Sequence, residues 1–286
     1  MDSEDFVRRF LFEDLDIRGA LVRLGPSFRA LCHGRNYPPA VIKLLGEAAA
    51  VTVLVGSNLK QPGRLSVQLQ GHGQVPLLLI ECNEQLDIRG MAQHRDVSEG
   101  ASLDALIGDG KLAITLQPEH AARPYQSLVP IDGQSMAEVF EHFLEQSEQA
   151  PSRLFLLADE QAAAGLFLQK LPRADERDPD GWNRVLHLAQ TIRPEELRSQ
   201  PIERLLHAVF PEEDVRLFGH HGVRYFCPKD WEKVCNMLRS LGRAEIEDIL
   251  REHGEIVIHD DICNHEYRFS AEEARALFED GSRTLH

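Results

Sequence analysis

Apolar and polar residues alternate along several stretches of the first part of the chain, as is typical of half-buried β-strands. Residues 64–70 alternate strictly, with the apolar side chains on one face. The turn at 71–73, which contains two glycines, leads into an apolar run at 75–80, so this region predicts a hairpin. A further alternating run at 112–116 predicts another strand.

Helical spacing of apolar residues predicts two long helices among these strands. Pro39 precedes an apolar run that continues to Leu54, and proline is tolerated in the first turn of a helix because its missing N–H has no partner there. Ser135 and Glu138 form a capping box that opens the second helix. The apolar stripe of this helix ends before Pro151.

Two further apolar runs, 154–157 and 166–168, complete an expected α/β N-terminal domain with mixed or antiparallel sheets, residues 1–172. Residues 173–222 are predicted to form a helical linker of short amphipathic helices. Isolated helices of this length are marginal in water, so we expect them to dock on a neighbour and to undock easily. Their apolar stripes are two sets, Val185, Leu188, Ala189 and Ile192, and Ile202, Leu205, Leu206 and Val209.

The last part, residues 223–286, is predicted to be a small α+β domain resembling a zinc ribbon. Two amphipathic helices end near Gly242 and Gly254 and precede a hairpin formed by 255–259 and 266–269. The few apolar residues in this part would ordinarily need a metal or another covalent link to hold a fold.

Composition narrows the classes of function. The chain has 286 residues, 43% of them hydrophobic, and a net charge of −15 without a cluster of Lys or Arg, which argues against nucleic acid as a partner. The longest apolar stretch, 48–55, is far shorter than the roughly 18 residues of a membrane helix, so no membrane association is expected. The acidic start does not resemble a secretory signal, and five cysteines do not suggest a disulfide framework. We therefore expect a cytoplasmic protein.

Half of a four-thiol zinc site is present in the last part. Cys227 is followed by Lys229 where a zinc ribbon has a second cysteine, and Asp260 stands where the other ribbon loop has the partner of Cys263. One interpretation is a zinc site with Cys227, Cys263 and Asp260 as ligands, completed by a nearby histidine, His259 or His265. The ammonium group of Lys229 opposes a cation at this place.

Two other interpretations need no metal. Cys227 and Cys263 can face each other and form one reversible disulfide. Alternatively, Lys229 and Asp260 form an ion pair that holds the two loops together, and the chain is insensitive to redox conditions. Such an exposed pair contributes only about 0–1 kcal/mol, against roughly 10–16 kcal/mol for a complete zinc site, so an ion pair alone cannot replace the metal.

The remaining cysteines and histidines suggest packing rather than chemistry. Cys235 lies on the apolar face of its helix, and Cys32 and Cys82 are expected to be buried. His220 and His221 are expected in a solvated hinge before the last domain. No catalytic triad, phosphate-binding loop or paired carboxylates are recognisable, so neither an enzyme nor a nucleotide site is expected.

The chain resembles the thirty-three-kilodalton heat-shock protein family of bacterial redox-regulated chaperones. The resemblance covers nearly all residues and is carried by segments 10–13, 67–73, 87–90, 108–110, 153–155 and 254–263. It implies an ATP-independent holdase that binds unfolded or misfolded client proteins under stress, with an N-terminal domain and a helical linker as the client surface. It also implies four cysteines that bind zinc when reduced and form two disulfides when oxidised, with dimerisation on activation.

This chain departs from the family at the switch, because Lys229 and Asp260 replace two of the four cysteines. Activation through two disulfides is therefore excluded, and redox regulation is expected to be altered or lost. Two alternatives belong to other classes: a thiol-disulfide oxidoreductase that uses Cys227 and Cys263, and a zinc-ribbon module for protein interaction. The chain has no Cys-x-x-Cys motif at a helix start, and its charge disfavours nucleic acid.

Overall fold

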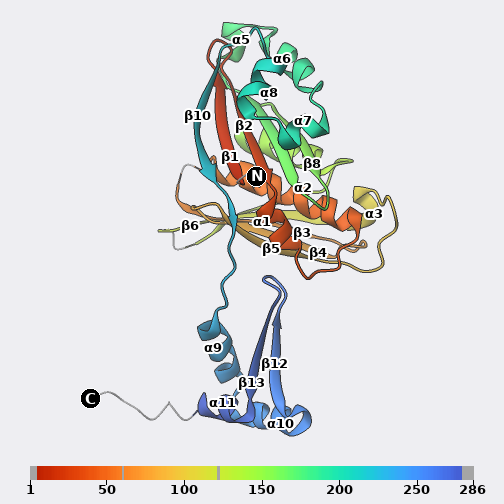
Figure 1. Ribbon diagram of the computed structural model, residues 1–286, viewed down its shortest axis with the longest axis vertical. Helices are drawn as coiled ribbons and strands as arrows, with labels where there is room; N and C mark the ends of the chain where they lie inside the picture. Colours follow the sequence, from red (N-terminus) through yellow and green to blue (C-terminus); the bar gives the residue numbers. More distant parts are fainter. Residues whose placement is uncertain (1–4, 60, 121–122, 279–286) are drawn as a thin grey trace, which may run out of the picture. The chain divides into compact units, whose positions relative to one another are not determined.

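The computed structural model describes residues 5–59, 61–120 and 123–278. Contacts divide the chain into two units, Met1–Phe226 and Cys227–His286, each with its own hydrophobic core. The first unit contains two β-sheets and the second a β-hairpin with helices (Figure 1). The expected mixed α/β architecture with antiparallel and mixed sheets is confirmed.

The first sheet has five antiparallel strands in the order β10-β1-β2-β9-β8. Strand β2 is buried on both faces and therefore shows no alternation. The strands are β1 (Phe6–Phe12), β2 (Ile17–Leu24), β8 (Ser152–Ala158), β9 (Ala163–Lys170) and β10 (Val215–Gly222).

The second sheet has six strands in the order β11-β5-β4-β3-β6-β7, antiparallel except for β11, which runs parallel to β5. The predicted hairpin is β3–β4, with Leu65 opposite Cys82, and the predicted strand at 112–116 is β6. The strands are β3 (Gly63–Gln70), β4 (Leu77–Cys82), β5 (Asp87–Gln93), β6 (Lys111–Pro118), β7 (Tyr125–Pro130) and β11 (Arg224–Tyr225).

Helix α2 (Pro39–Gly56) lies between the two sheets and contacts strands of both (Figure 1). It is an 18-residue helix apolar enough to cross a membrane by length and composition, which the sequence analysis did not anticipate. Because 67% of this window is buried among the sheets, α2 is the core helix of the unit. The other helices around this core are α1 (Pro26–Cys32), α3 (Leu103–Ile107) and α4 (Met136–Glu148).

The predicted capping box of α4 is present in altered form. The hydroxyl of Ser135 accepts a hydrogen bond from the backbone N–H of Glu138 at 3.3 Å, as expected. The carboxylate of Glu138 accepts from the backbone N–H of Gln134 at 2.7 Å, one residue earlier than the motif predicts.

Four short helices follow β9, and the last three of them cover the face of the first sheet that points away from α2 (Figure 1). They are α5 (Ala174–Arg177), α6 (Gly181–Ala189), α7 (Pro194–Ser199) and α8 (Ile202–Val209). The sequence predicted two of them, α6 and α8, from their apolar stripes. It did not predict β10, which follows them and pairs with β1, so His220 and His221 lie in a strand and not in a hinge. The division into 1–172, 173–222 and 223–286 as functional parts stays a prediction.

The second unit is a small α+β fold. Helices α9 (Trp231–Leu241) and α10 (Arg243–His253) end at Gly242 and at Gly254, which has a left-handed φ of 79°. A hairpin of β12 (Glu255–Asp260) and β13 (His265–Ser270) follows, and then α11 (Ala271–Ala276). The helices and the hairpin share a core whose largest fully buried side chain is that of Tyr267.

Candidate functional site

The turn between β12 and β13 positions Cys263. Asp260 ends β12, and its Oδ1 accepts hydrogen bonds from the backbone N–H groups of Ile262 at 3.0 Å and Cys263 at 3.4 Å. Asn264 adopts a left-handed φ of 54°, a conformation that asparagine tolerates well in tight turns. Asp260 is therefore a structural residue of this turn, whatever else it binds.

Cys227 and Cys263 lie side by side, as two of the interpretations of the sequence require. Their sulfur atoms are within bonding distance and their Cα atoms are 5.8 Å apart, inside the range in which two cysteines can be bridged without moving the backbone. Both residues are buried. The structure records them as a disulfide that links the start of the second unit to the hairpin turn.

The segment that follows Cys227 is fastened to β13. The Nζ of Lys229 donates a hydrogen bond to the carbonyl oxygen of Glu266 at 2.9 Å, and the backbone N–H of Asp230 donates to the hydroxyl of Tyr267 at 2.9 Å. Lys229 also lies over two aromatic rings, 5.6 Å from that of Trp231 and 5.4 Å from that of Tyr267. Such contacts contribute roughly 0.5–1 kcal/mol each at exposed sites.

The predicted ion pair between Lys229 and Asp260 is wrong, because within residues 5–59, 61–120 and 123–278 no ion pair joins them. Lys229 is held by a carbonyl and two rings, and Asp260 by backbone N–H groups of its own turn. Nothing in the sequence indicates that Tyr267 holds Lys229 and Asp230, beyond its inward position in an alternating strand.

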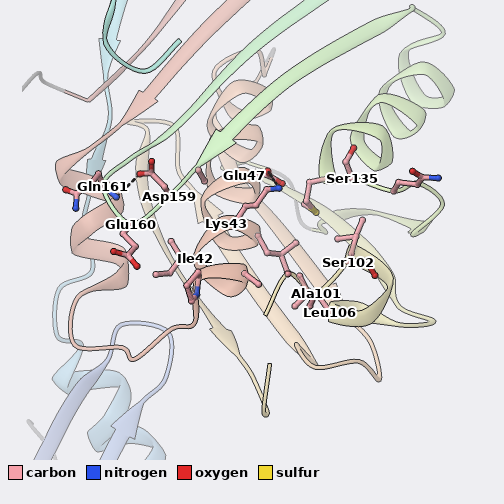
Figure 2. Close-up of a pocket in the computed structure, with 18 residues that line it drawn as sticks. Ile42, Lys43, Glu47, Ala101, Ser102, Leu106, Ser135, Asp159, Glu160 and Gln161 are labelled. Carbon is pink, nitrogen blue, oxygen red and sulfur yellow. Dashed lines mark hydrogen bonds and ion pairs between the residues drawn. The ribbon is translucent and has the colours of Figure 1, made fainter. Parts of the chain in front are cut away.

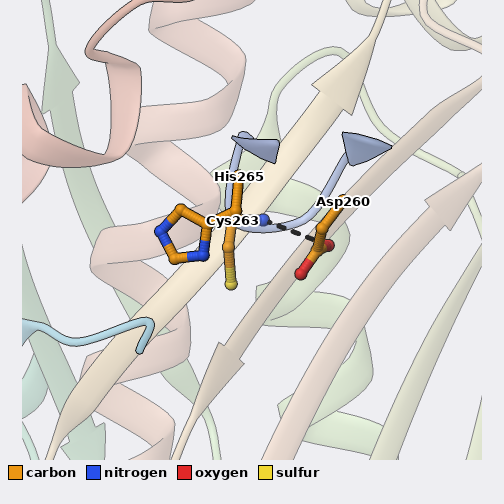
Figure 3. A group of neighbouring side chains, drawn as sticks. All are labelled: Asp260, Cys263 and His265. Atoms are coloured by element: carbon orange, nitrogen blue, oxygen red, sulfur yellow. Dashed lines mark hydrogen bonds between the residues drawn. The ribbon is translucent and has the colours of Figure 1, made fainter. Parts of the chain in front are cut away.

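Asp260, Cys263 and His265 form a group that could hold a metal ion (Figure 3). Their ligand atoms lie within 4.8 Å of one another, and the ring of His265 and the carboxylate of Asp260 flank the sulfur of Cys263. Among the residues that the structure describes, the buried Nδ1 of His265 has no hydrogen-bond partner, so this nitrogen is available to a metal. A mixed set of sulfur, nitrogen and oxygen suits zinc. His259 is outside this group and lies 4.0 Å from a carboxylate oxygen of Asp261.

Of the other three cysteines, Cys82 is buried as expected, whereas Cys32 is only partly buried. Burial raises the pKa of Cys32 to about 11, and burial together with the nearby Asp87 raises that of Cys82 to about 12. Both therefore stay protonated and unreactive at neutral pH. Cys235 packs partly buried against the core of the second unit.

A second region of interest is the interface between α5–α8 and the first sheet, because the apolar stripes predicted from the sequence are buried there. The helices contribute Val185, Ala189, Ile202, Leu205 and Leu206, and the sheet contributes Phe10, Phe12, Ile17, Leu21, Leu166 and Leu168. Separation of the helices from the sheet would expose both apolar faces at once.

Arg23 of β2 fastens this interface by binding the C-terminal end of α7. Its Nε donates to the carbonyl oxygen of Leu197 at 2.8 Å, and one terminal nitrogen donates to those of Glu196 at 3.3 Å and Gln200. The side chain is buried, and burial lowers its pKa to about 10, although the carboxylate of Glu203 acts in the opposite direction. Arg23 therefore remains charged at neutral pH. The role of Arg23 was not predicted from the sequence, although a charged residue in a largely apolar strand was a signal.

Comparisons with known proteins agree with this architecture. The sequence model of the Hsp33 protein family matches residues 5–270. The chain is 40% identical to the 33 kDa chaperonin of Methylobacillus flagellatus over 280 residues, which cover 97% of this chain and 96% of that protein. It is 38% identical to the 33 kDa chaperonin of Chromobacterium violaceum, with 98% of this chain and 95% of that protein covered.

A solved structure shares the fold. The crystal structure of the 33 kDa chaperonin of Thermotoga maritima superposes with a TM-score of 0.83 and covers 97% of this chain and 99% of that chain, at 21% sequence identity. The family model and the curated relatives both extend over almost the whole length of the chain. The chain therefore belongs to the Hsp33 family.

Proposed function

We propose that this protein is a cytoplasmic, ATP-independent holdase that binds unfolding proteins and has no catalytic role. The apolar interface beneath α5–α8 supports the proposal, because a large hydrophobic surface is buried there under short helices. Helices of this length are marginal without their packing partners, so they can separate from the sheet at low free-energy cost. A contiguous apolar surface exposed in this way is what binding to unfolded chains requires.

The proposed regulation uses one disulfide where the resemblance implies two. The observation that carries it is the proximity of Cys227 and Cys263. Oxidation by peroxide would remove one hydrogen from each thiol, form the S–S bond and reduce the peroxide to two molecules of water. The three remaining cysteines are embedded in other packing, so this pair is the proposed redox element.

In the reduced state, Cys263 would be available to a metal together with Asp260 and His265. Zinc bound there would organise the turn and hold the thiolate of Cys263. The disulfide and the metal share one sulfur atom and therefore exclude each other. With at most two thiolates, those of Cys263 and the neighbouring Cys227, we expect zinc affinity well below that of four-thiol sites.

Light scattering of a thermally unfolding client protein tests the proposed function. The chain is added fully reduced or after peroxide treatment, and the variants are Cys227→Ser and Cys263→Ser. Cys235→Ser is the matched control, because it removes a thiol of the same unit that is not part of the pair. We expect suppression of scattering by the wild-type chain and by the control.

The dependence on oxidation distinguishes the forms of regulation. Suppression only after peroxide, lost in both pair variants, would support a switch with one disulfide. Equal suppression in all samples would support a holdase without redox control. Absence of suppression in every sample would refute the proposed function. Zinc binding by the reduced chain, followed with a competing chelator and weakened by His265→Ala, tests the metal group separately.

A further inference from the structure

A groove of about 730 Å³ opens in the first unit and is lined by residues of that unit alone. It is bounded by the first turns of α2, the loop before α3, the start of α4 and the turn between β8 and β9 (Figure 2). All of these elements belong to one unit with a continuous core, so the groove is a fixed feature of that unit. The volume is sufficient for several side chains of a bound polypeptide.

The groove has an apolar middle and an acidic end. Ile42 of α2 lies midway along it, and Ala101 and Leu106 line it toward the starts of α3 and α4 (Figure 2). Asp159 and Glu160 stand together at the opposite end, in the β8–β9 turn (Figure 2). An apolar segment with a basic side chain at one end would match this distribution.

The charges in the middle of the groove offset each other. Lys43 and Glu47 are one helical turn apart on α2, with 3.9 Å between Nζ and the nearer carboxylate oxygen. Asp159 is paired with Arg198, so the carboxylate that remains to attract a ligand is that of Glu160. Glu160 is exposed, and in the part of the chain that the structure describes its carboxylate has no ion-pair partner.

The acidic end already binds two guanidinium groups, because the carbonyl oxygen of Gln161 in the same turn accepts a hydrogen bond from the guanidinium of Arg29 at 3.1 Å. Asp159 accepts a charged hydrogen bond from Arg198, which lies on α7 near the carbonyls held by Arg23. This contact shows that the β8–β9 turn can receive a basic side chain from another segment. It also ties the end of the groove to one of the helices that cover the first sheet.

We propose that this groove binds an extended segment of an unfolding protein, with an aliphatic side chain against Ile42 and Leu106 and a Lys or Arg against Glu160. The inference rests on the proposed holdase function and names the class of client segment that the protein prefers. A second copy of this chain is a poorer occupant, because two chains of net charge −15 repel each other.

Fluorescence anisotropy with labelled peptides tests the inference directly. The probe is a short peptide of leucine and lysine, and two matched peptides carry glutamate or glutamine in place of lysine. We expect the lysine peptide to bind at least about tenfold more tightly than the glutamate peptide, and this difference to shrink at high salt.

Two variants assign the binding to the groove. Ile42→Gln removes the apolar contact and should weaken the lysine peptide about tenfold, and Glu160→Lys should weaken it about threefold to tenfold. Leu128→Gln and Glu145→Lys are the matched controls, since both residues are exposed outside the groove. The controls should bind like the wild-type chain. Far-ultraviolet circular dichroism of each variant confirms that it is folded.

Three outcomes would overturn the inference: affinity unchanged in both groove variants, affinity indifferent to peptide charge, or a dimer that Ile42→Gln dissociates while no peptide binds. The last result would assign the groove to a second copy of the chain. These failures are separable from failure of the holdase proposal, because peptide affinity is measured without a client. If the chain suppresses aggregation but the groove variants bind peptide like the wild-type chain, the proposed role of the groove is refuted and the proposed holdase function stands.

Discussion

Replacement of Arg23 by methionine should loosen α7 and α8 from the first sheet without any change in redox state. Arg23 donates hydrogen bonds to three carbonyl groups at the end of α7, and the methionine side chain keeps most of the buried apolar stem while it removes the donors. The last carbonyls of a helix have no partners within the helix. In the Arg23→Met variant these carbonyl groups would lose the hydrogen-bond donors that Arg23 supplies.

The size of the effect follows from these contacts. A hydrogen bond from a charged donor contributes about 1.5–3 kcal/mol, but three bonds from one guanidinium are not additive. Burial of the cation opposes them, as the lowered pKa of Arg23 indicates. We therefore expect a loss of about 2–3 kcal/mol in the free energy of docking, which is a roughly 30- to 150-fold larger open population.

Amide hydrogen exchange followed by mass spectrometry measures this population. Peptides that cover α7 and α8 should exchange about 30-fold faster or more in Arg23→Met, while α2 keeps its protection. Arg216→Met is the control, because the contacts of Arg216 in the same sheet are exposed: an ion pair with Glu13 and a cation–π contact with Phe218. Unchanged exchange in α7 would refute the role of Arg23. Equal acceleration in α2 would show general destabilisation instead.

Further predictions concern stability, measured by chemical denaturation. Burial raises the pKa of Glu47 above 4.5, and the nearby Lys43 opposes this shift only in part. The ionised carboxylate therefore destabilises the folded state at pH values above the folded-state pKa. This destabilisation disappears as the pH falls toward 4.5, because the carboxyl group is then protonated in the folded state. Glu47→Gln should therefore stabilise the protein at pH 7 and have little effect at pH 4.5; the same gain at both values would contradict this. A Cβ at Gly19 would overlap the buried ring of Phe10 opposite it, so Gly19→Ala should destabilise by about 1–3 kcal/mol, whereas Gly219→Ala, with open space around it, should be nearly neutral.

The sequence predicted those elements in which only one face is buried, because one-sided burial produces a periodic pattern of apolar residues. Strand β3 alternates because one face packs on α2, and α4 and α8 carry a single apolar stripe. Strand β2 was missed because α2 packs on one face and α5–α8 on the other, so its residues are apolar on both. Strand β10 was missed for the opposite reason: its Gly and His residues are exposed, and it is held by backbone pairing with β1.

At the candidate site, the sequence located the cysteines but not their surroundings. The approach of Cys227 to Cys263 follows from the two ribbon loops. The position of Lys229 depends on Tyr267 and Trp231, which approach it only in the folded unit. Tertiary packing also leaves the apolar residues at the two ends of α9, Trp231 and Leu241, half exposed, at 46% and 50%, which helical spacing alone does not indicate.

Both ends of the α5–α8 segment are anchored in the same sheet, by β9 at Lys170 and by β10 at Val215. A segment that separates between two fixed ends remains a closed loop, and its helices stay at high effective concentration near the surface they left. The helices would compete permanently with any client bound to the exposed face of the sheet. Release of the client would then need no nucleotide, since the helices could displace the client when they dock on the sheet again.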